Sequence, residues 1–125
     1  MQNKIEQIEL RTHLEQITEE CGELTQACMK LIRAMGNGNP CSVSEEEAID
    51  KVVEEFADVM VAGNYLMDRL NGMTAYPVWM RINDISAEKE ARWNKRLEEY
   101  DAKQESMVDS VSNHCDGDSC DITSE

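Results

Sequence analysis

The chain has 125 residues, the size of a single domain, and a formal net charge of −14 at pH 7. This acidity disfavours a nucleic-acid-binding surface, because attraction to phosphates needs clustered Lys and Arg. The negative charge is still compatible with a small anionic substrate, since a bound divalent cation reverses the local electrostatic field. No apolar run is long enough to cross a membrane, the N-terminus lacks a signal-peptide pattern, and the five cysteines form no regular framework. We therefore expect a cytoplasmic protein with reduced thiols that binds neither membrane nor nucleic acid.

Strong helix formers dominate the chain and only 5% of its residues are aromatic, which predicts an all-α fold. The first predicted helix covers about residues 3 to 35, where apolar side chains recur at steps of three and four. It ends at the helix-breaking Gly-Asn-Gly-Asn-Pro run at 36–40. The second predicted helix covers about residues 44 to 70, because Ser44 and Glu47 have the spacing of a capping box and Asn71-Gly72 closes the periodic segment.

The third predicted helix begins near Pro77, and its apolar positions from Val78 to Tyr100 keep to one face. Ser86 is a second position at which a helix could begin, so a kink there is an open alternative. From Ala102 onward Ser, Asp and Glu dominate, which is typical of disorder. We therefore predict one helical domain, residues 1–101, followed by a disordered acidic tail, residues 102–125.

Two acidic pairs with the same spacing are the main candidate site. Glu20 and Glu23 lie three residues apart in the first helix, and Glu55 and Asp58 repeat that spacing in the second. Residues three apart on a helix have β-carbons about 5–6 Å apart, so each pair can direct two carboxylates at one point. Opposed faces would bring four carboxylates together, and Mg²⁺ or Mn²⁺ would relieve their repulsion. The alternative is two solvated helix faces, but both pairs adjoin apolar positions, which favours a metal site.

A basic stripe on the third helix is the second candidate feature. Lys89, Arg92 and Arg96 fall on one side at steps of three and four, in a chain that is otherwise strongly acidic. Beside an acidic metal site, these cations could hold phosphates that the metal does not reach. Alternatively, they only complement the helix dipole and pair with neighbouring glutamates.

The segments Glu19-Glu20-Cys21-Gly22-Glu23-Leu24 and Glu54-Glu55-Phe56-Ala57-Asp58-Val59 resemble the MazG-like, all-α nucleoside triphosphate pyrophosphohydrolases. The signature of that superfamily is E-E-x-x-E on one helix and E-x-x-D on the next, and the resemblance extends over about residues 5 to 100. It implies long antiparallel helices in a four-helix-type bundle completed by dimerisation. It also implies Mg²⁺-dependent, or Mn²⁺-dependent, cleavage of an NTP or dNTP to the monophosphate and pyrophosphate. A phosphoribosyl-ATP pyrophosphohydrolase is a narrower alternative within the same superfamily.

The resemblance implies roles for individual residues. The metal ligands would be Glu20, Glu23, Glu55 and Asp58, with Glu19 orienting or deprotonating the attacking water. The phosphate-binding candidates are Lys30, Lys89, Arg92 and Arg96, and Lys30 could equally pair with Glu23. Weaker candidates for the base and sugar are His13, Gln16 and Tyr65, for which packing or surface roles are the alternative.

A function of another class stays open at the level of sequence. Amphipathic helices of this kind can form a non-catalytic dimerisation or metal-binding module, in which the acids are solvated or bind metal without turnover. In either case we expect a homodimer or a homotetramer, since three long helices rarely bury all their apolar faces alone.

Overall fold

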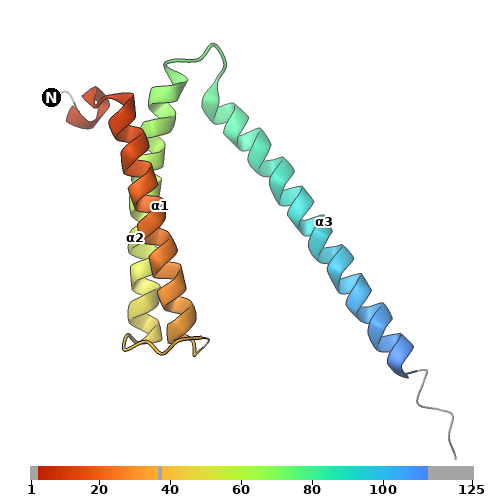
Figure 1. Ribbon diagram of the computed structural model, residues 1–125. Helices are drawn as coiled ribbons and strands as arrows, with labels where there is room; N and C mark the ends of the chain where they lie inside the picture. Colours follow the sequence, from red (N-terminus) through yellow and green to blue (C-terminus); the bar gives the residue numbers. More distant parts are fainter. Residues whose placement is uncertain (1–2, 37, 113–125) are drawn as a thin grey trace, which may run out of the picture. The chain divides into compact units, whose positions relative to one another are not determined.

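The computed structural model describes residues 3–36 and 38–112. A short 3₁₀ helix, η1, covers Lys4–Gln7, and three α-helices follow: α1 Leu10–Ala34, α2 Glu45–Asn71 and α3 Val78–Ser112 (Figure 1). These described residues contain no strand, so the predicted all-α class is confirmed. None of their helices combines the length and apolar content needed to cross a membrane. The chain divides into two compact units at Met80–Arg81.

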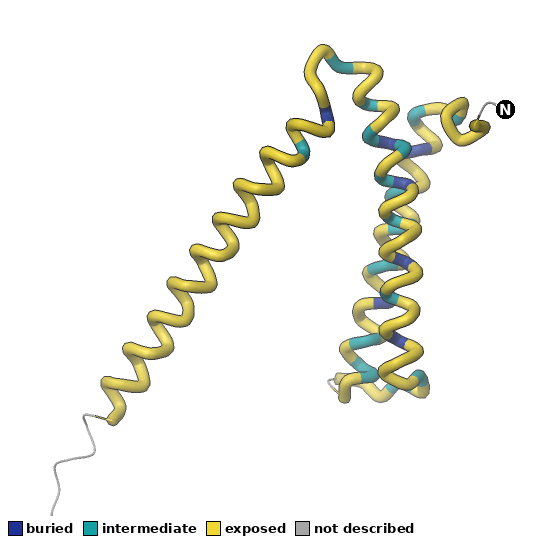
Figure 2. Tube along the Cα trace, turned by 180° about the vertical axis from the view of Figure 1, so that it is seen from behind, coloured by how far each residue is buried: buried dark blue, intermediate teal, exposed yellow. Residues whose placement is uncertain are grey.

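The first unit is built on an antiparallel hairpin of α1 and α2, which lie side by side along their lengths (Figure 1). The positions buried between them follow the line of contact (Figure 2) and are mostly small, with Ala27, Ala48 and Ala62 joined by Leu66. Small side chains let two helices approach closely, but they bury little apolar area. Many large apolar side chains of the hairpin, among them Leu14, Val53 and Phe56, remain exposed.

The predicted first helix is divided in the structure. Ile8 and Glu9 are extended, with φ/ψ of −68°/142° and −63°/148°, and separate η1 from α1. Asn3 caps η1 and ties it to α2: its Nδ2 donates to Tyr65 Oη at 2.8 Å and its Oδ1 accepts from Ile5 N at 3.1 Å. These bonds tie the N-terminal segment to α2, where Ile5 and Ile8 line a pocket with Tyr65. Contact with α2 has therefore replaced continuation of the helix.

The loop between α1 and α2 follows the predicted breaker run. Gly36 and Gly38 adopt positive φ values of 86° and 89°, a conformation that costs glycine little and other residues more. At the start of α2 the predicted capping box is present: Glu47 N donates to Ser44 Oγ at 3.2 Å, and Ser44 N donates to Glu47 Oε2 at 3.0 Å. These bonds from Ser44 lower the pKa of Glu47, so the cap is fully formed at neutral pH.

Replacing Ser44 with Ala should therefore lower the free energy of unfolding by about 1 kcal/mol, the usual cost of losing a side-chain N-cap. Urea denaturation followed by circular dichroism measures the change. Ser42→Ala is the matched control, because Ser42 is exposed in the same loop and lies outside the cap. Equal destabilisation by the two substitutions would contradict the assignment of the cap.

The end of α2 is fixed to the first turn of α3. Gly72 ends α2 as predicted, and Asn71 Oδ1 accepts a hydrogen bond from Val78 N at 2.9 Å, which caps α3 from across the loop. One turn earlier, Asp68 Oδ1 accepts from Trp79 Nε1 at 2.8 Å. The burial of Val78 completes this junction within the first unit.

Helix α3 is longer than predicted and has no interruption. It passes through Ser86 without interruption, so the alternative of a restart there is wrong. It also continues to Ser112, which replaces the predicted disorder over 102–112 with helix. The stretch 102–107 contains Ala, Lys, Gln, Glu and Met, and neither Gly nor Pro interrupts the helix before Ser112. The rest of the predicted tail, 113–125, lies outside the described residues.

Candidate metal centre

Three of the four predicted metal ligands come together in the hairpin. Glu20 and Glu23 lie on consecutive turns of α1, and Glu55 faces them from α2. One carboxylate oxygen from each of the three lies within 4.8 Å of the other two. Glu55 is only 4% exposed, Glu20 is half-buried and Glu23 is exposed. The group thus has a buried base and an open side, which suits a cation that must also contact a substrate.

The two carboxylate oxygens of Glu55 differ in their surroundings. Oε1 forms an ion pair with Lys51 Nζ at 2.5 Å, one turn earlier on α2, and this ammonium holds the pKa of Glu55 below its usual range. Oε2 is buried and accepts no hydrogen bond. A buried carboxylate oxygen without a donor is costly, so such an atom calls for a partner. A divalent cation between the three carboxylates would supply one.

Glu23 responds to the same surroundings in the opposite direction. Its pKa is raised, chiefly because a protonated Glu23 carboxyl could donate a hydrogen bond to the Glu55 carboxylate and because the Glu55 charge repels an ionised Glu23; loss of hydration and the charges of Glu20 and Glu19 add to this effect. Without a cation, Glu23 therefore retains its proton to higher pH than an ordinary glutamate. Binding of a divalent cation has to displace that proton, so affinity should rise with pH.

These opposite shifts predict a pH optimum for the stability of the metal-free protein. Because the folded pKa of Glu23 is raised, its contribution is complete below the unfolded value of about 4.5 and is lost as the pH rises through the folded value. Because the folded pKa of Glu55 is lowered, its contribution is present above that value and is lost as the pH falls through the folded one. We expect the Tm in chelator to rise from neutral pH toward mild acid and to fall in stronger acid.

The comparison that isolates the cluster is wild type against Glu23→Gln, measured by thermal unfolding across the same pH series. Other carboxylates also titrate in this acidic chain, so the expected result is a smaller rise in Tm for Glu23→Gln and a higher Tm for this variant at neutral pH. Parallel curves for the two proteins would contradict the coupling between Glu23 and Glu55.

A cavity of about 500 Å³ adjoins the cluster on the side of the hairpin loop. Glu23 and Glu55 line one part of it, while Lys30, Arg33 and Lys51 supply positive charge. Lys30 therefore lies beside the carboxylates, as its position seven residues after Glu23 suggests. Arg33 and Lys51 are not among the phosphate-binding residues predicted from the sequence. Their spacing was the available signal, since Arg33 follows Lys30 by three residues and Lys51 precedes Glu55 by four. Arg33 Nε is buried and has no hydrogen-bond partner, a second unsatisfied polar atom at this cavity.

A second cavity, of about 320 Å³, adjoins the other side of the cluster. Asp58 lies here with Glu20 and outside the group of three carboxylates, so the expected convergence of all four is not found. The same cavity gathers the three predicted base and sugar residues, His13, Gln16 and Tyr65. Gln16 Nε2 donates to Glu20 Oε1, and His13 is 5% exposed. The remaining wall is largely apolar and comprises Ile5, Ile8, Thr12, Val61 and Ala62.

The other predicted site residues line neither of these two cavities. Glu19 is exposed and lines a shallow depression with Leu14 and Thr18, because adjacent helical residues point about 100° apart. The predicted basic stripe is confirmed as a shared face of α3, where the three cations line a depression with aromatic neighbours. This stripe belongs to the second unit. Its residues are Lys89, Arg92 and Arg96, with Trp93, Leu97 and Tyr100 beside them.

Comparison of the chain with known proteins gives no matching family model, no matching curated protein and no matching solved structure.

Proposed function

We propose that this protein is a metal-dependent nucleoside triphosphate pyrophosphohydrolase, a hydrolase acting on phosphoric anhydrides, with Mg²⁺ or Mn²⁺ as cofactor. The observation that carries the proposal is the meeting of Glu20, Glu23 and Glu55 around a buried carboxylate oxygen that has no partner. Hard divalent cations prefer such oxygen donors. The resemblance of the acidic motifs to the MazG-like enzymes suggests the reaction, and the cluster of carboxylates in the hairpin is the proposed cation site.

Glu20, Glu23 and Glu55 would hold the cation, which would supply positive charge to offset that of the phosphates and would make water more readily deprotonated. Asp58 lies next to Glu20 and is proposed to complete the site from the second cavity. Glu19, adjacent to the cluster in sequence, is the proposed acceptor of the water proton. It must reach the site from an exposed position, so it is the least supported of these roles.

The cavity beside Lys30, Arg33 and Lys51 is the proposed position of the triphosphate. Arg33 lines this cavity, and its guanidinium is proposed to bind a phosphate oxygen. Lys51 pairs with Glu55 and also lines this cavity, so its ammonium is a further candidate for binding phosphate. Lys89 and Arg92 of the basic stripe on α3 are also proposed to bind phosphate, and Arg96 is the third candidate that the resemblance implies.

The second cavity is the proposed site for the base and sugar. It combines an apolar wall with a few polar side chains, the usual composition of a small-molecule site, and it meets the metal ligands at Glu20 and Asp58. His13, Gln16 and Tyr65, which all line this cavity, are proposed to orient the nucleoside. Tyr65 already accepts a hydrogen bond from Asn3, so the N-terminal segment would hold it in position.

Dimerisation is proposed to cover the exposed apolar face of the hairpin. Exposed side chains on each helix follow alternating steps of three and four, the spacing of a helix–helix seam. On α1 and its C-cap they are Leu14, Thr18, Cys21, Thr25, Cys28, Ile32 and Met35, and on α2 Ile49, Val53, Phe56 and Met60. We call these positions the hairpin seam.

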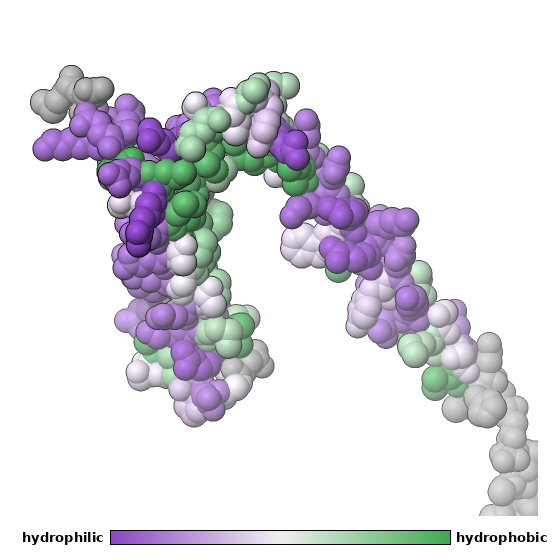
Figure 3. Space-filling view, turned by 45° about the horizontal axis from the view of Figure 1, so that its top comes forward, coloured by the Kyte–Doolittle hydropathy of each residue, from purple (hydrophilic) through white to green (hydrophobic). Residues whose placement is uncertain are grey.

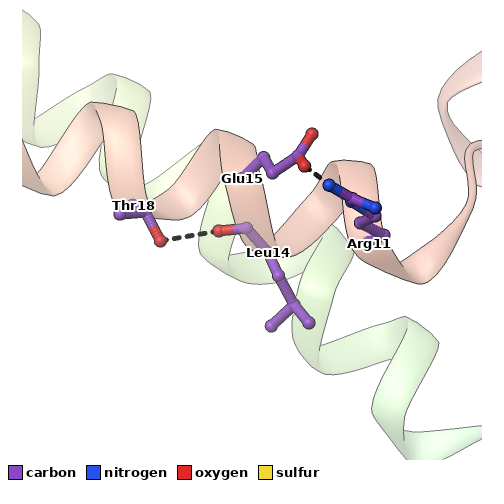
Figure 4. Close-up of polar contacts among 4 residues, drawn as sticks. All are labelled: Arg11, Leu14, Glu15 and Thr18. Atoms are coloured by element: carbon purple, nitrogen blue, oxygen red, sulfur yellow. Dashed lines mark hydrogen bonds and ion pairs between the residues drawn. The ribbon is translucent and has the colours of Figure 1, made fainter.

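The threonines in the hairpin seam do not oppose its burial. Thr18 Oγ1 donates to the Leu14 carbonyl at 2.7 Å (Figure 4), and Thr25 Oγ1 donates to the Cys21 carbonyl at 2.8 Å. Their hydroxyl protons are therefore satisfied within α1, while Arg11 and Glu15 pair with each other on the same stretch at 2.8 Å (Figure 4). Two hairpins packed through this seam would form a four-helix-type bundle, as a homodimer or within a homotetramer.

The direct test is release of pyrophosphate from a panel of NTPs and dNTPs with Mg²⁺ or Mn²⁺, with chelator as the control. We expect metal-dependent release, and the preferred nucleotide identifies the substrate. Absence of release from every nucleotide, with cation binding still seen by calorimetry, would refute the enzymatic proposal. That result would favour the alternative function, a non-catalytic helical dimerisation and metal-binding module. The exposed apolar side chains of the hairpin seam support this alternative.

A further inference from the structure

The second half of α3 carries a heptad pattern that the proposed activity does not use. Five large apolar side chains, between 49% and 67% exposed, fall at steps of four and three once Gln104 is included. Taking Leu97 as position a, the a and d positions are Trp93, Leu97, Tyr100, Gln104, Met107 and Val111. Apolar surface accordingly appears at intervals along α3 among hydrophilic groups (Figure 3).

This seam on α3 has no partner within its own unit. The described part of that unit, residues 81–112, is a single helix, and all of its residues except Ile82 are exposed (Figure 2). Most helical stability in proteins comes from packing of an apolar face rather than from intrinsic propensity. A helix from Val78 to Ser112 with such a regular seam therefore calls for a partner helix.

The charged residues beside this α3 seam favour a second copy of the chain as the partner helix and favour a parallel orientation of the two helices. Arg96 occupies a g position and Asp101 the e position five residues later. In a parallel, in-register pair, g of one helix faces e of the next heptad in the other, so each Arg96 would meet Asp101 of the second copy. An antiparallel pair with the same overlap would set Asp101 against Asp101 and Lys103 against Lys103. Charge complementarity thus favours the parallel arrangement.

Gln104 supports the same arrangement. It is the one polar side chain at the a and d positions from Trp93 to Val111. In a parallel, in-register pair it meets Gln104 of the second copy, and the two amides can hydrogen-bond to each other. A single polar residue at an a position is a known device for fixing register at some cost in stability. Outer positions of the same stretch, such as Glu98, Ala102 and Asp109, are charged or small.

We propose that the 93–112 segment of α3 forms a parallel, in-register, two-stranded coiled coil with the same segment of a second copy of this chain. This interface is separate from the hairpin seam and does not depend on the proposed enzymatic activity. It engages Arg96 in an interchain ion pair and leaves Lys89 and Arg92, which precede the coil, available for phosphate. Two distinct self-association surfaces would allow a tetramer, or one dimer closed at both.

Charge reversal on the full-length chain tests the proposal, with sedimentation measurements of association as the readout. Asp101→Arg and Arg96→Asp each turn two symmetric attractions into repulsions, and each should weaken association through α3 about tenfold. The double variant restores opposite charges and should recover most of the loss. Asp109→Arg makes the same change of charge at an outer f position and is the matched control, expected to stay near wild type.

Leu97→Asp gives a second readout, because it places a charge in the centre of the seam. It should abolish association through α3 and reduce the helical signal in circular dichroism, since the unpaired helix frays. Unchanged association in every variant would overturn the proposal, as would failure of the double variant to recover. Loss of helix at all concentrations without any change in mass would also overturn it, because the seam would then pack within its own chain.

Discussion

Glu55→Gln is expected to abolish metal-dependent pyrophosphate release while leaving the hairpin folded. Glu55 is the buried member of the cluster and brings the carboxylate of α2 to the two of α1. Glutamine keeps the size of the side chain but removes the charge that both the cation and Lys51 use. Loss of an outer-shell partner alone typically costs 10–100-fold in metal affinity or activity, so loss of this ligand should cost more than about 100-fold.

Glu54→Gln is the matched control for this substitution. Glu54 is the preceding residue on α2 and is exposed, and its contact with Lys51 Nζ at 3.2 Å is a surface ion pair. Surface pairs contribute little, so the control should keep nearly full turnover and metal affinity. Circular dichroism and calorimetry on both variants separate loss of the fold from loss of the site. Full turnover by Glu55→Gln would contradict the proposed metal centre, as would an equal loss in both variants.

The sequence was sufficient to predict those features that depend on neighbouring residues along the chain, such as the ends of helices. The start of α2 at Ser44, its end at Gly72 and the sharing of one α1 face by Glu20 and Glu23 all follow from caps and helical spacing. The sequence offered the opposition of the two acidic faces as a condition for a metal site, and the structure meets that condition for Glu55.

Features that depend on contacts between residues far apart in the sequence could not be predicted from local patterns. The break before α1 accompanies contact of η1 with α2, including a hydrogen bond between Asn3 and Tyr65, which lie 62 residues apart. Asp58 follows Glu55 by nearly one turn, yet the offset between the helices places it at the second cavity beside Glu20. Arg33 and Lys51 become site candidates only when the fold brings α1 and α2 together around the first cavity. The extension of α3 to Ser112 is a different case, in which polar composition suggested disorder although helix propensity was high.

Phe56→Asp is expected to dissociate the proposed hairpin dimer. Phe56 is the only phenylalanine in the chain, and it is 52% exposed in the middle of the seam on α2, although it follows the buried Glu55 directly. Aromatic side chains near the centre of an interface commonly account for 2 kcal/mol or more, so a charge there should weaken association at least about 30-fold. Phe56→Leu keeps an apolar side chain and is the control, expected to remain associated.

Sedimentation of the two variants measures the effect, and metal binding by calorimetry accompanies it. The three carboxylates of the cluster come from α1 and α2 of one chain, so dissociated Phe56→Asp should still bind the cation. If pyrophosphate release is lost while cation binding persists, the second copy contributes to substrate binding or to the proton acceptor, which would account for Glu19 lying among seam residues such as Leu14 and Thr18. Unchanged association of Phe56→Asp would show that the seam is not the interface, and the bundle would then have to close through another face of the hairpin.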